Sequence, residues 1–191
     1  MIFSTIHVVG SNNNLSPWNG LGEELIGEQV PEHPEQCQGR STRVALCQER
    51  TAEYQERLAA ALEWLDKTFQ AADRLNSAGV FILIHADPEF DLSADDPDRT
   101  GFNDFLAALA EKSVEFGKPV VLAQGDSHFL VIDKPLFAQT ADSTDRRIPN
   151  FTRIQSFGTP DIYWVRVTVD SNRPGVFLFE PVVVEANRPV F

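Results

Sequence analysis

The spacing of apolar residues predicts a strand followed by a long helix in the first part of the chain. Residues 2–9 (IFSTIHVV) are rich in β-branched residues, which favour a strand. Over residues 50–77 apolar side chains recur at three- and four-residue steps, as they do on the buried face of a helix. Gly79 follows this pattern and is placed to end the helix.

Two continuous apolar runs, VFILI (80–84) and PVVLAQ (119–124), are typical of buried strands. A second helix is expected between them, over about 101–116, because its Phe and Leu residues fall on one face and Gly117 stands at its end. The order strand, helix, strand, helix, strand favours parallel neighbours joined by right-handed crossovers. The carboxyl ends of such strands meet at one edge of the sheet, where ligands bind.

The last third of the chain has a different pattern. Residues 151–158, 161–170 and 175–184 predict β-strands joined by short turns, and alternation in the second of them is typical of a half-exposed antiparallel strand. We therefore predict one α/β domain over 1–191, in which a strand-helix-strand-helix-strand unit is followed by antiparallel strands and 125–191 is mostly β.

Residues 10–49 predict a long loop or insertion, since they are irregular and rich in Gly, Pro, Asn, Glu and Gln. Cys37 and Cys47 lie in this stretch. They could form a disulfide, but two cysteines cannot define a disulfide framework or a zinc site, and we favour two free thiols.

The charge of the chain excludes some partners. Its 191 residues carry a formal net charge of −12, which repels nucleic-acid backbones and anionic membrane surfaces. It has no apolar run of about 18 residues and no basic leader, so we expect a cytoplasmic protein as the sequence stands, with a longer secreted form left open.

Polar turns follow each of the first three predicted strands: GSNNN, HADPEFD and GDSH. The second contains His85 and Asp87, and the third contains Asp126 and His128. Imidazole nitrogens and carboxylate oxygens are the ligands of hydrolytic metal sites, so these turns predict a divalent-metal site at the sheet edge. The alternative is structural: Asp and Ser also satisfy the amides of turns.

Three other residues have two interpretations each. Asn12 and Asn13 could ligate a metal or orient a phosphate, although Asn is also a good turn former, which we favour slightly. Arg153 could clamp a phosphate bidentately or form an ion pair at the surface, and we favour the ion pair.

Four segments together resemble the calcineurin-like metallophosphoesterase superfamily, and a bacterial branch of it in particular. They are HVVGSNNN, GFNDFLAAL, KPVVLAQGDSHFLVIDKPL and NFTRIQSFGTPDIYWVRVTVD. The resemblance implies two packed β-sheets flanked by helices, a two-metal centre of Mn, Fe, Zn or Mg, and a small phosphoester substrate. His85 matches the lone-His motif and His128 the last His of the final motif, where Asp126 stands in place of a His.

The first three ligand motifs of that superfamily have no counterpart in this chain. We therefore expect a metallophosphoesterase-like domain that is incomplete or inactive alone. It would be the C-terminal half of a phosphoesterase, a non-catalytic binding or assembly domain on the same scaffold, or a protein that binds one metal through His85, Asp126 and His128. A missing layer would leave an apolar surface, so we also expect a homo-oligomer.

Overall fold

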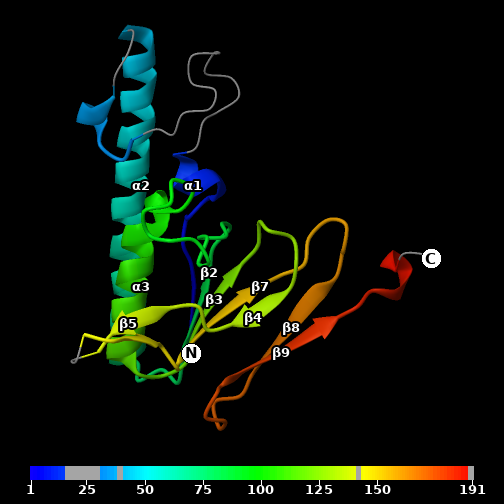
Figure 1. The fold of residues 1–191 in the computed structure, drawn as a ribbon. Helices are drawn as coiled ribbons and strands as arrows, with labels where there is room; N and C mark the ends of the chain where they lie inside the picture. Colours follow the sequence, from blue (N-terminus) through cyan, green and yellow to red (C-terminus); the bar gives the residue numbers. More distant parts are fainter. Residues whose placement is uncertain (16–30, 38–40, 141–142, 189–191) are drawn as a thin grey trace.

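The computed structural model describes residues 1–15, 31–37, 41–140 and 143–188 and shows a mixed α/β fold built on a five-stranded sheet (Figure 1). The strands run β1-β2-β3-β7-β4 across this main sheet, and only β4 is antiparallel to its neighbour. Their bounds are β1 Ile2–Thr5, β2 Val80–Leu83, β3 Val120–Gln124, β7 Phe151–Gln155 and β4 Val131–Asp133.

Two antiparallel ribbons and the helices complete the described part of the chain. The ribbons are β5 (Phe137–Gln139) with β6 (Asp145–Arg147), and β8 (Trp164–Val169) with β9 (Phe177–Val182). The helices are α1 (Gly10–Asn14), α2 (Ser41–Arg74) and α3 (Asn103–Phe116), and the short 3-10 helices are η2 (Pro34–Gln36), η3 (Thr100–Phe102) and η4 (Glu185–Asn187).

The helices α2 and α3 cover one face of the main sheet, which we call the helix face (Figure 1). The strands present alternate residues to it, such as Ile82 and Leu122, and the helices contribute Leu65 and Phe105. As predicted, α3 ends at Gly117, which adopts the left-handed φ of 65° that glycine accommodates without strain.

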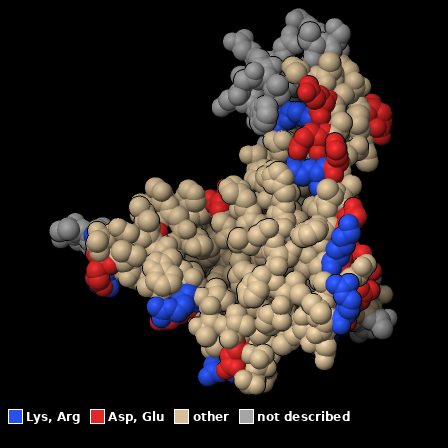
Figure 2. Space-filling view, turned by 180° about the vertical axis from the view of Figure 1, so that it is seen from behind, with Lys and Arg blue, Asp and Glu red and all other residues tan. Residues whose placement is uncertain are grey.

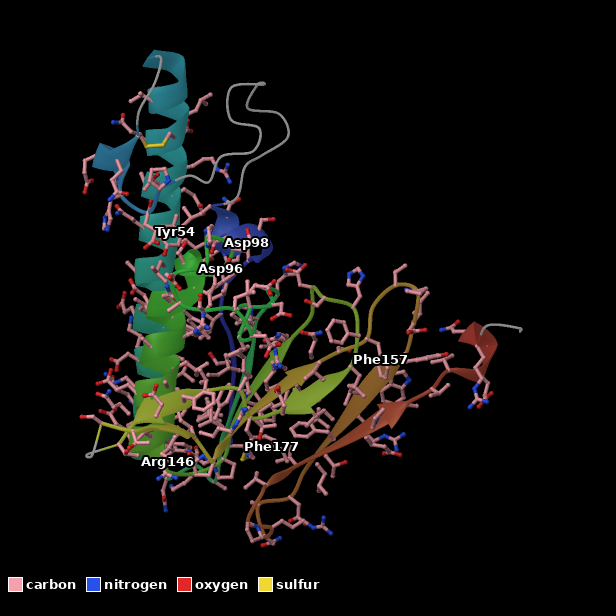
Figure 3. The ribbon with its side chains drawn as sticks, in the orientation of Figure 1. Tyr54, Asp96, Asp98, Arg146, Phe157 and Phe177 are labelled. Carbon is pink, nitrogen blue, oxygen red and sulfur yellow. A yellow bond between two sulfur atoms is a disulfide. The ribbon has the colours of Figure 1, made fainter. Side chains whose placement is uncertain are left out.

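The ribbon β8–β9 packs on the opposite face, which we call the ribbon face. Phe177 points from β9 towards the main sheet (Figure 3), and its ring centroid lies 5.7 Å from that of Phe81 on β2. Val121, Ile154 and Val176 complete a small buried cluster with it. The predicted alternation is observed over 164–168, because Val165 and Val167 are half-buried while Trp164, Arg166 and Thr168 are exposed; it ends at Val169, which is also exposed.

The long loop predicted over 10–49 is partly wrong. The helix α2 begins at Ser41 instead of near residue 50, and η2 precedes it. The prediction of free thiols is also wrong, because Cys37 and Cys47 form a disulfide that ties η2 to the first turns of α2. Residues 16–30 and 38–40 lie outside the described residues.

Two strand predictions also need correction. The strand β1 ends at Thr5, since the chain beyond it turns towards α1 instead of continuing to residue 9. The strand β7 was expected in an antiparallel region; it does pair antiparallel with β4, but its other neighbour, β3, is parallel. Apolar content marks a buried strand but does not give the direction of its neighbour.

No helix among the described residues is long and apolar enough to cross a membrane.

Candidate functional site

The turns after β1, β2 and β3 meet at the carboxyl edge of the main sheet, as the parallel topology predicts. The amide of His85 donates to the carbonyl of Val8 at 3.3 Å, and the amide of Gly125 donates to the carbonyl of His85 at 3.3 Å. These backbone hydrogen bonds place the polar segments that follow the three strands side by side.

The turn after β1 is a left-handed one. Ser11, Asn12 and Asn13 have φ values of 57°, 50° and 51°, a region in which Asn is better tolerated than most residues. Asn12 is buried: its Nδ2 donates to the carbonyl of Pro97 at 2.7 Å, and its Oδ1 accepts from the amide of Gly101 at 2.7 Å. The buried Asn13 donates to the carbonyl of Gly101 at 2.9 Å. Both amides therefore hold a turn, as we favoured from the sequence.

Residues from all three turns line a pocket of about 220 Å³, which we call the strand-end pocket. Its lining consists of Ser11, Asn12, Asp87, Glu89, Leu92, Asp98, Phe102 and Asp126. Asp98 lies beside α1 in Figure 3. Burial and then the neighbouring carboxylates Asp87, Asp98, Asp126 and Asp91 raise the pKa of Glu89 above its ordinary value. The pocket is therefore strongly negative.

Asp126 lies directly against the first turn. A Cβ atom added to Gly10 would lie 2.5 Å from Oδ2 of Asp126, so the carboxylate occupies space that only glycine leaves open. Asp126 itself has a φ of 73°. A non-glycine residue holds such a conformation only where its surroundings fix it, and such positions cluster at functional sites.

Asp87 is the centre of a hydrogen-bond network beneath the strand-end pocket. Its Oδ1 accepts from Nε2 of Gln124 at 2.9 Å and from the amide of Glu89 at 3.2 Å, and its Oδ2 accepts from Oγ of Ser127 at 2.6 Å. The same Nε2 of Gln124 also lies 3.0 Å from Oε1 of the buried Gln155. The network fixes the turns after β2 and β3 to each other.

The two predicted histidine ligands do not line this pocket. The imidazole of His128 is exposed, with Nδ1 3.2 Å from the carbonyl oxygen of Thr159, and it lies against Gly158. His85 is also exposed. Among the residues that the structure describes, no three His, Cys, Asp or Glu side chains are placed so that they could hold a metal ion. The roles of His85, Asp126 and His128 as metal ligands therefore stay predictions.

Arg153 does not line the strand-end pocket, and it forms an ion pair that is more buried than expected. Its Nε and Nη2 donate to the two carboxylate oxygens of Asp133 at 2.8 and 2.6 Å, and its guanidinium lies over the ring of Phe90. The side chain is only 5% exposed, so the expected position at the surface is wrong. Burial opposes its charge, but the hydrogen bonds and charge of Asp133 together with the charges of Asp87 and Asp91 outweigh burial and raise the pKa of Arg153.

Glu89 and Asp98 line the pocket without having been predicted from the sequence. Both belong to the loop that follows β2. That position could have identified them from the sequence, because loops after parallel strands border the edge of the sheet where ligands bind. Their spacing matches no ligand motif, so the signal identifies the loop and not the residues.

Comparisons with protein-family models, curated proteins and solved structures gave no match to this chain. The resemblance to metallophosphoesterases therefore rests on the sequence segments quoted above.

Proposed function

We propose that this chain is a metallophosphoesterase-like domain that carries part of a phosphoester hydrolase site and does not hydrolyse phosphoesters by itself. The observation that carries the proposal is the strand-end pocket, where Asp87, Glu89, Asp98 and Asp126 surround one small volume at the carboxyl edge of parallel strands. The resemblance of the surrounding sequence segments to that superfamily supports the same assignment.

The charge of the pocket determines what it can bind. Four carboxylates attract a divalent cation and repel a free phosphoester, which would need a cation to enter. The side chains as they stand do not form a complete ligand set, because His85 and His128 do not line the pocket and Asp87 already accepts three hydrogen bonds. We therefore expect weak cation binding, and we assign no hydrolytic step to the chain alone.

A second candidate is a non-catalytic binding or assembly domain on the same scaffold. One observation favours it: polar groups that could have held a phosphate or a metal already make structural bonds. Arg153 is held by Asp133, and the side chains of Asn12 and Asn13 are held by the segment 97–101. On this alternative the acidic pocket has no ligand role.

Binding of Mn²⁺, followed by the loss of its free electron paramagnetic resonance signal, separates the two candidates. We expect a dissociation constant on the order of 1 mM, as for oxygen-ligand sites with few contacts. Asp126→Asn should weaken binding at least about fivefold, since it removes one of the four carboxylates that line the pocket. Asp145→Asn, on the exposed strand β6, is the control and should leave binding unchanged. Equal binding by both variants would contradict the proposal and favour the non-catalytic domain.

A hydrolysis assay tests whether the site is incomplete. The purified chain with Mn²⁺ and an aryl phosphodiester should release no more product than buffer with the metal. Turnover by the wild-type chain that disappears in His128→Ala would show a complete site and would contradict the proposal.

A further inference from the structure

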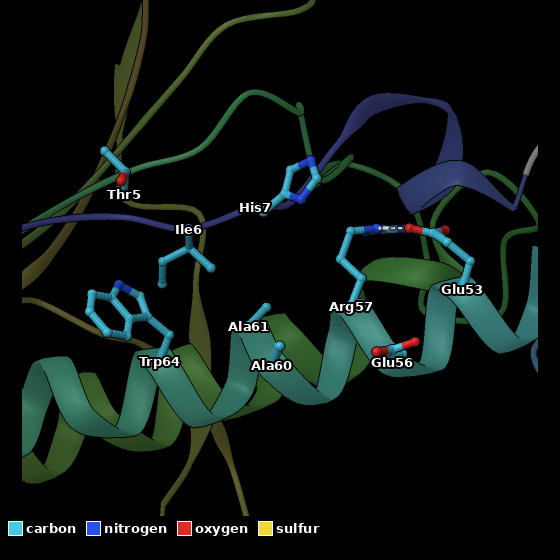
Figure 4. Close-up of a pocket in the computed structure, with 9 residues that line it drawn as sticks. All are labelled: Thr5, Ile6, His7, Glu53, Glu56, Arg57, Ala60, Ala61 and Trp64. Carbon is cyan, nitrogen blue, oxygen red and sulfur yellow. Dashed lines mark hydrogen bonds and ion pairs between the residues drawn. The ribbon is translucent and has the colours of Figure 1, made fainter.

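Many basic side chains of this acidic chain are paired with carboxylates. A groove of about 510 Å³ between residues 5–7 and α2 contains one example, because the guanidinium of Arg57 donates to Glu53 and to Oδ1 of Asn13 (Figure 4). On the face that Figure 2 shows, the blue basic side chains likewise lie beside red acidic ones. A guanidinium that lines a cavity without such a partner is therefore a candidate for binding an anion from outside the chain.

Arg99 is a guanidinium of this kind. Its Nη1 donates to the carbonyl of Leu92, whereas its Nε is buried and has no hydrogen-bond partner. Within the described ranges, Arg99 forms no ion pair and its Nη2 makes no hydrogen bond. A buried N–H group without a partner lowers the stability of a fold, so its presence needs a specific explanation. A bound anion is an explanation that also accounts for the charge.

Arg99 lines a pocket of about 400 Å³, which we call the arginine pocket. This pocket lies between the loop after β2, the first half of α3 and the segment that leads into β5, and its size is typical of small-molecule sites. None of the described residues that line it is acidic. Its walls are mostly apolar and include Phe90, Leu106, Ala107, Ala110, Leu136 and Phe137.

A second guanidinium lies next to the arginine pocket. Phe137 forms part of the wall and is 47% exposed, and the guanidinium of Arg147 lies over its ring, 4.7 Å from the centroid. The other polar lining residue, Asn103, already donates through Nδ2 to the carbonyl of Ala94 at 2.6 Å. Apolar walls with guanidinium groups beside them suit a ligand that has an apolar body and a negative charge.

We propose that the arginine pocket binds a small monocarboxylate with an aliphatic or aromatic body. The body lies between α3 and β5, and the carboxylate accepts hydrogen bonds from the edge of Arg99 that carries Nε and Nη2. Nη2 meets the ligand first, and a slight rotation of the side chain brings the shielded Nε to the same carboxylate. Arg153 binds a carboxylate through the same two atoms, which donate to Asp133 at 2.8 and 2.6 Å. The arginine pocket shares no lining residue with the strand-end pocket, so the inference does not depend on the proposed function.

A titration with 4-phenylbutyrate, followed by ¹⁵N–¹H nuclear magnetic resonance, tests the proposal. We expect a dissociation constant on the order of 1 mM for a ligand of this size. The Nε–H signal of Arg99 should shift during the titration, whereas that of Arg166 on β8 should not. The neutral amide, 4-phenylbutyramide, should bind at least about tenfold more weakly, because it lacks the charge that Arg99 recognises.

A matched pair of arginine substitutions tests the role of the charge. Arg99→Gln removes the guanidinium and should raise the dissociation constant of 4-phenylbutyrate at least about tenfold. The Nε–H signal that disappears in this variant is the one that belongs to Arg99. Arg166→Gln removes an exposed guanidinium that is paired with Glu180, and it should leave the dissociation constant unchanged.

A second pair of substitutions keeps Arg99 and tests the cavity. Ala107→Phe fills part of the arginine pocket from an exposed position of α3 and should also weaken binding at least about tenfold. Val114→Phe adds the same ring to α3 outside the pocket and should have no effect. Undetectable binding of 4-phenylbutyrate, equal binding of its amide, or unchanged binding in both Arg99→Gln and Ala107→Phe would overturn the proposal. Tighter binding of inorganic phosphate than of 4-phenylbutyrate would overturn the assignment to a carboxylate.

Discussion

The two faces of the main sheet are covered in different ways. The helix face carries a large core formed with α2 and α3, whereas the ribbon face has a cluster of only four buried apolar residues between the sheet and β8–β9. The same strands serve both faces, since Ile82 points to the helices and Phe81 to the ribbon. What differs is the cover: two helices bury the strands that they cross, and a two-stranded ribbon leaves Phe3 and Leu83 exposed.

This difference shows where the stability of the fold and its capacity for association are concentrated. A dense core resists the loss of even one side chain, because the cavity that remains is filled only in part. On a thinly covered face a substitution removes less buried contact and so costs less stability. Such a face also leaves more apolar surface exposed for a partner to bind. Substitutions on the two faces should therefore have unequal effects.

The largest effect is expected on the helix face. Phe105 is 0% exposed, and Phe105→Ala should lower the free energy of unfolding by about 4 kcal/mol, through lost burial and the cavity left behind. Urea unfolding followed by circular dichroism measures the change. Val114→Ala, at an exposed position of the same helix, should change it by less than about 0.5 kcal/mol. A similar loss in both variants would show that α3 is not the packed helix described.

The corresponding substitution on the ribbon face should cost less. Phe177→Ala removes the ring that contacts Phe81, and we expect a loss of about 2.5 kcal/mol, because the thinner layer can close over part of the cavity. The same urea experiment measures it. A loss equal to that of Phe105→Ala would contradict the contrast between the two faces.

A polar pair at the margin of the helix face comes next. Asp133→Ala leaves the buried guanidinium of Arg153 without its closest partner and should destabilise the protein by about 2 kcal/mol. The comparison is Glu180→Ala, which removes an exposed partner of Arg166 and should cost less than about 0.5 kcal/mol. Equal values for the two variants would mean that burial of Arg153 does not strengthen its pair.

The smallest effect concerns the strand-end pocket and is stabilising. The raised pKa of Glu89 means that its protonated form is favoured in the folded state. The stability that the protonated Glu89 gives to the folded state is fully present below the unfolded pKa of about 4.3. It is lost as the pH rises through the raised pKa of the folded state. Glu89→Gln should therefore be more stable than wild type by about 0.5 kcal/mol at pH 7 and equal to it near pH 4.

Thermal unfolding at both pH values tests this sign. Glu111→Gln, an exposed position on α3, is the control, and its difference from wild type should not follow the same trend. A Glu89→Gln variant that is less stable than wild type at pH 7 would show that the glutamate makes a favourable contact in the pocket.

The helix face was largely predictable from the sequence because its signals are local. The apolar spacing of α2, the runs VFILI and VVLAQ, and the stop at Gly117 each follow from neighbouring residues. The start of α2 was not predictable, because the apolar residues of its first turns, Val44–Cys47, are consecutive instead of recurring at helical steps, and the disulfide joins these turns to η2. The pairing of β7 with β3 depends on residues far apart in the chain and leaves no local signal.

The sequence predicted the location of the candidate site better than it predicted the residues that form it. Parallel strands bring Asp87 and Asp126 to one edge, as expected. The side chains of His85 and His128 follow the same strands but are directed by the backbone of their turns, and the φ of 66° at His128 has no signature in the sequence. The burial of Arg153 was also invisible, since its partner Asp133 lies on a short strand that was not predicted.

The left-handed turn at Ser11–Asn14 has a consequence for the order in which the molecule opens. Asn12 and Asn13 hold the segment 97–101, and Tyr54 on α2 donates a further hydrogen bond to the carbonyl of Gly101 at 3.3 Å. The bonds made by Asn12 and Asn13 join residues that lie 85 to 89 positions apart, so none of these three survives once the turn detaches. The amide of Gly101, whose acceptor is Asn12, therefore reports on the integrity of the acidic pocket, and its hydrogen exchange measures how often that pocket opens while the two cores stay folded.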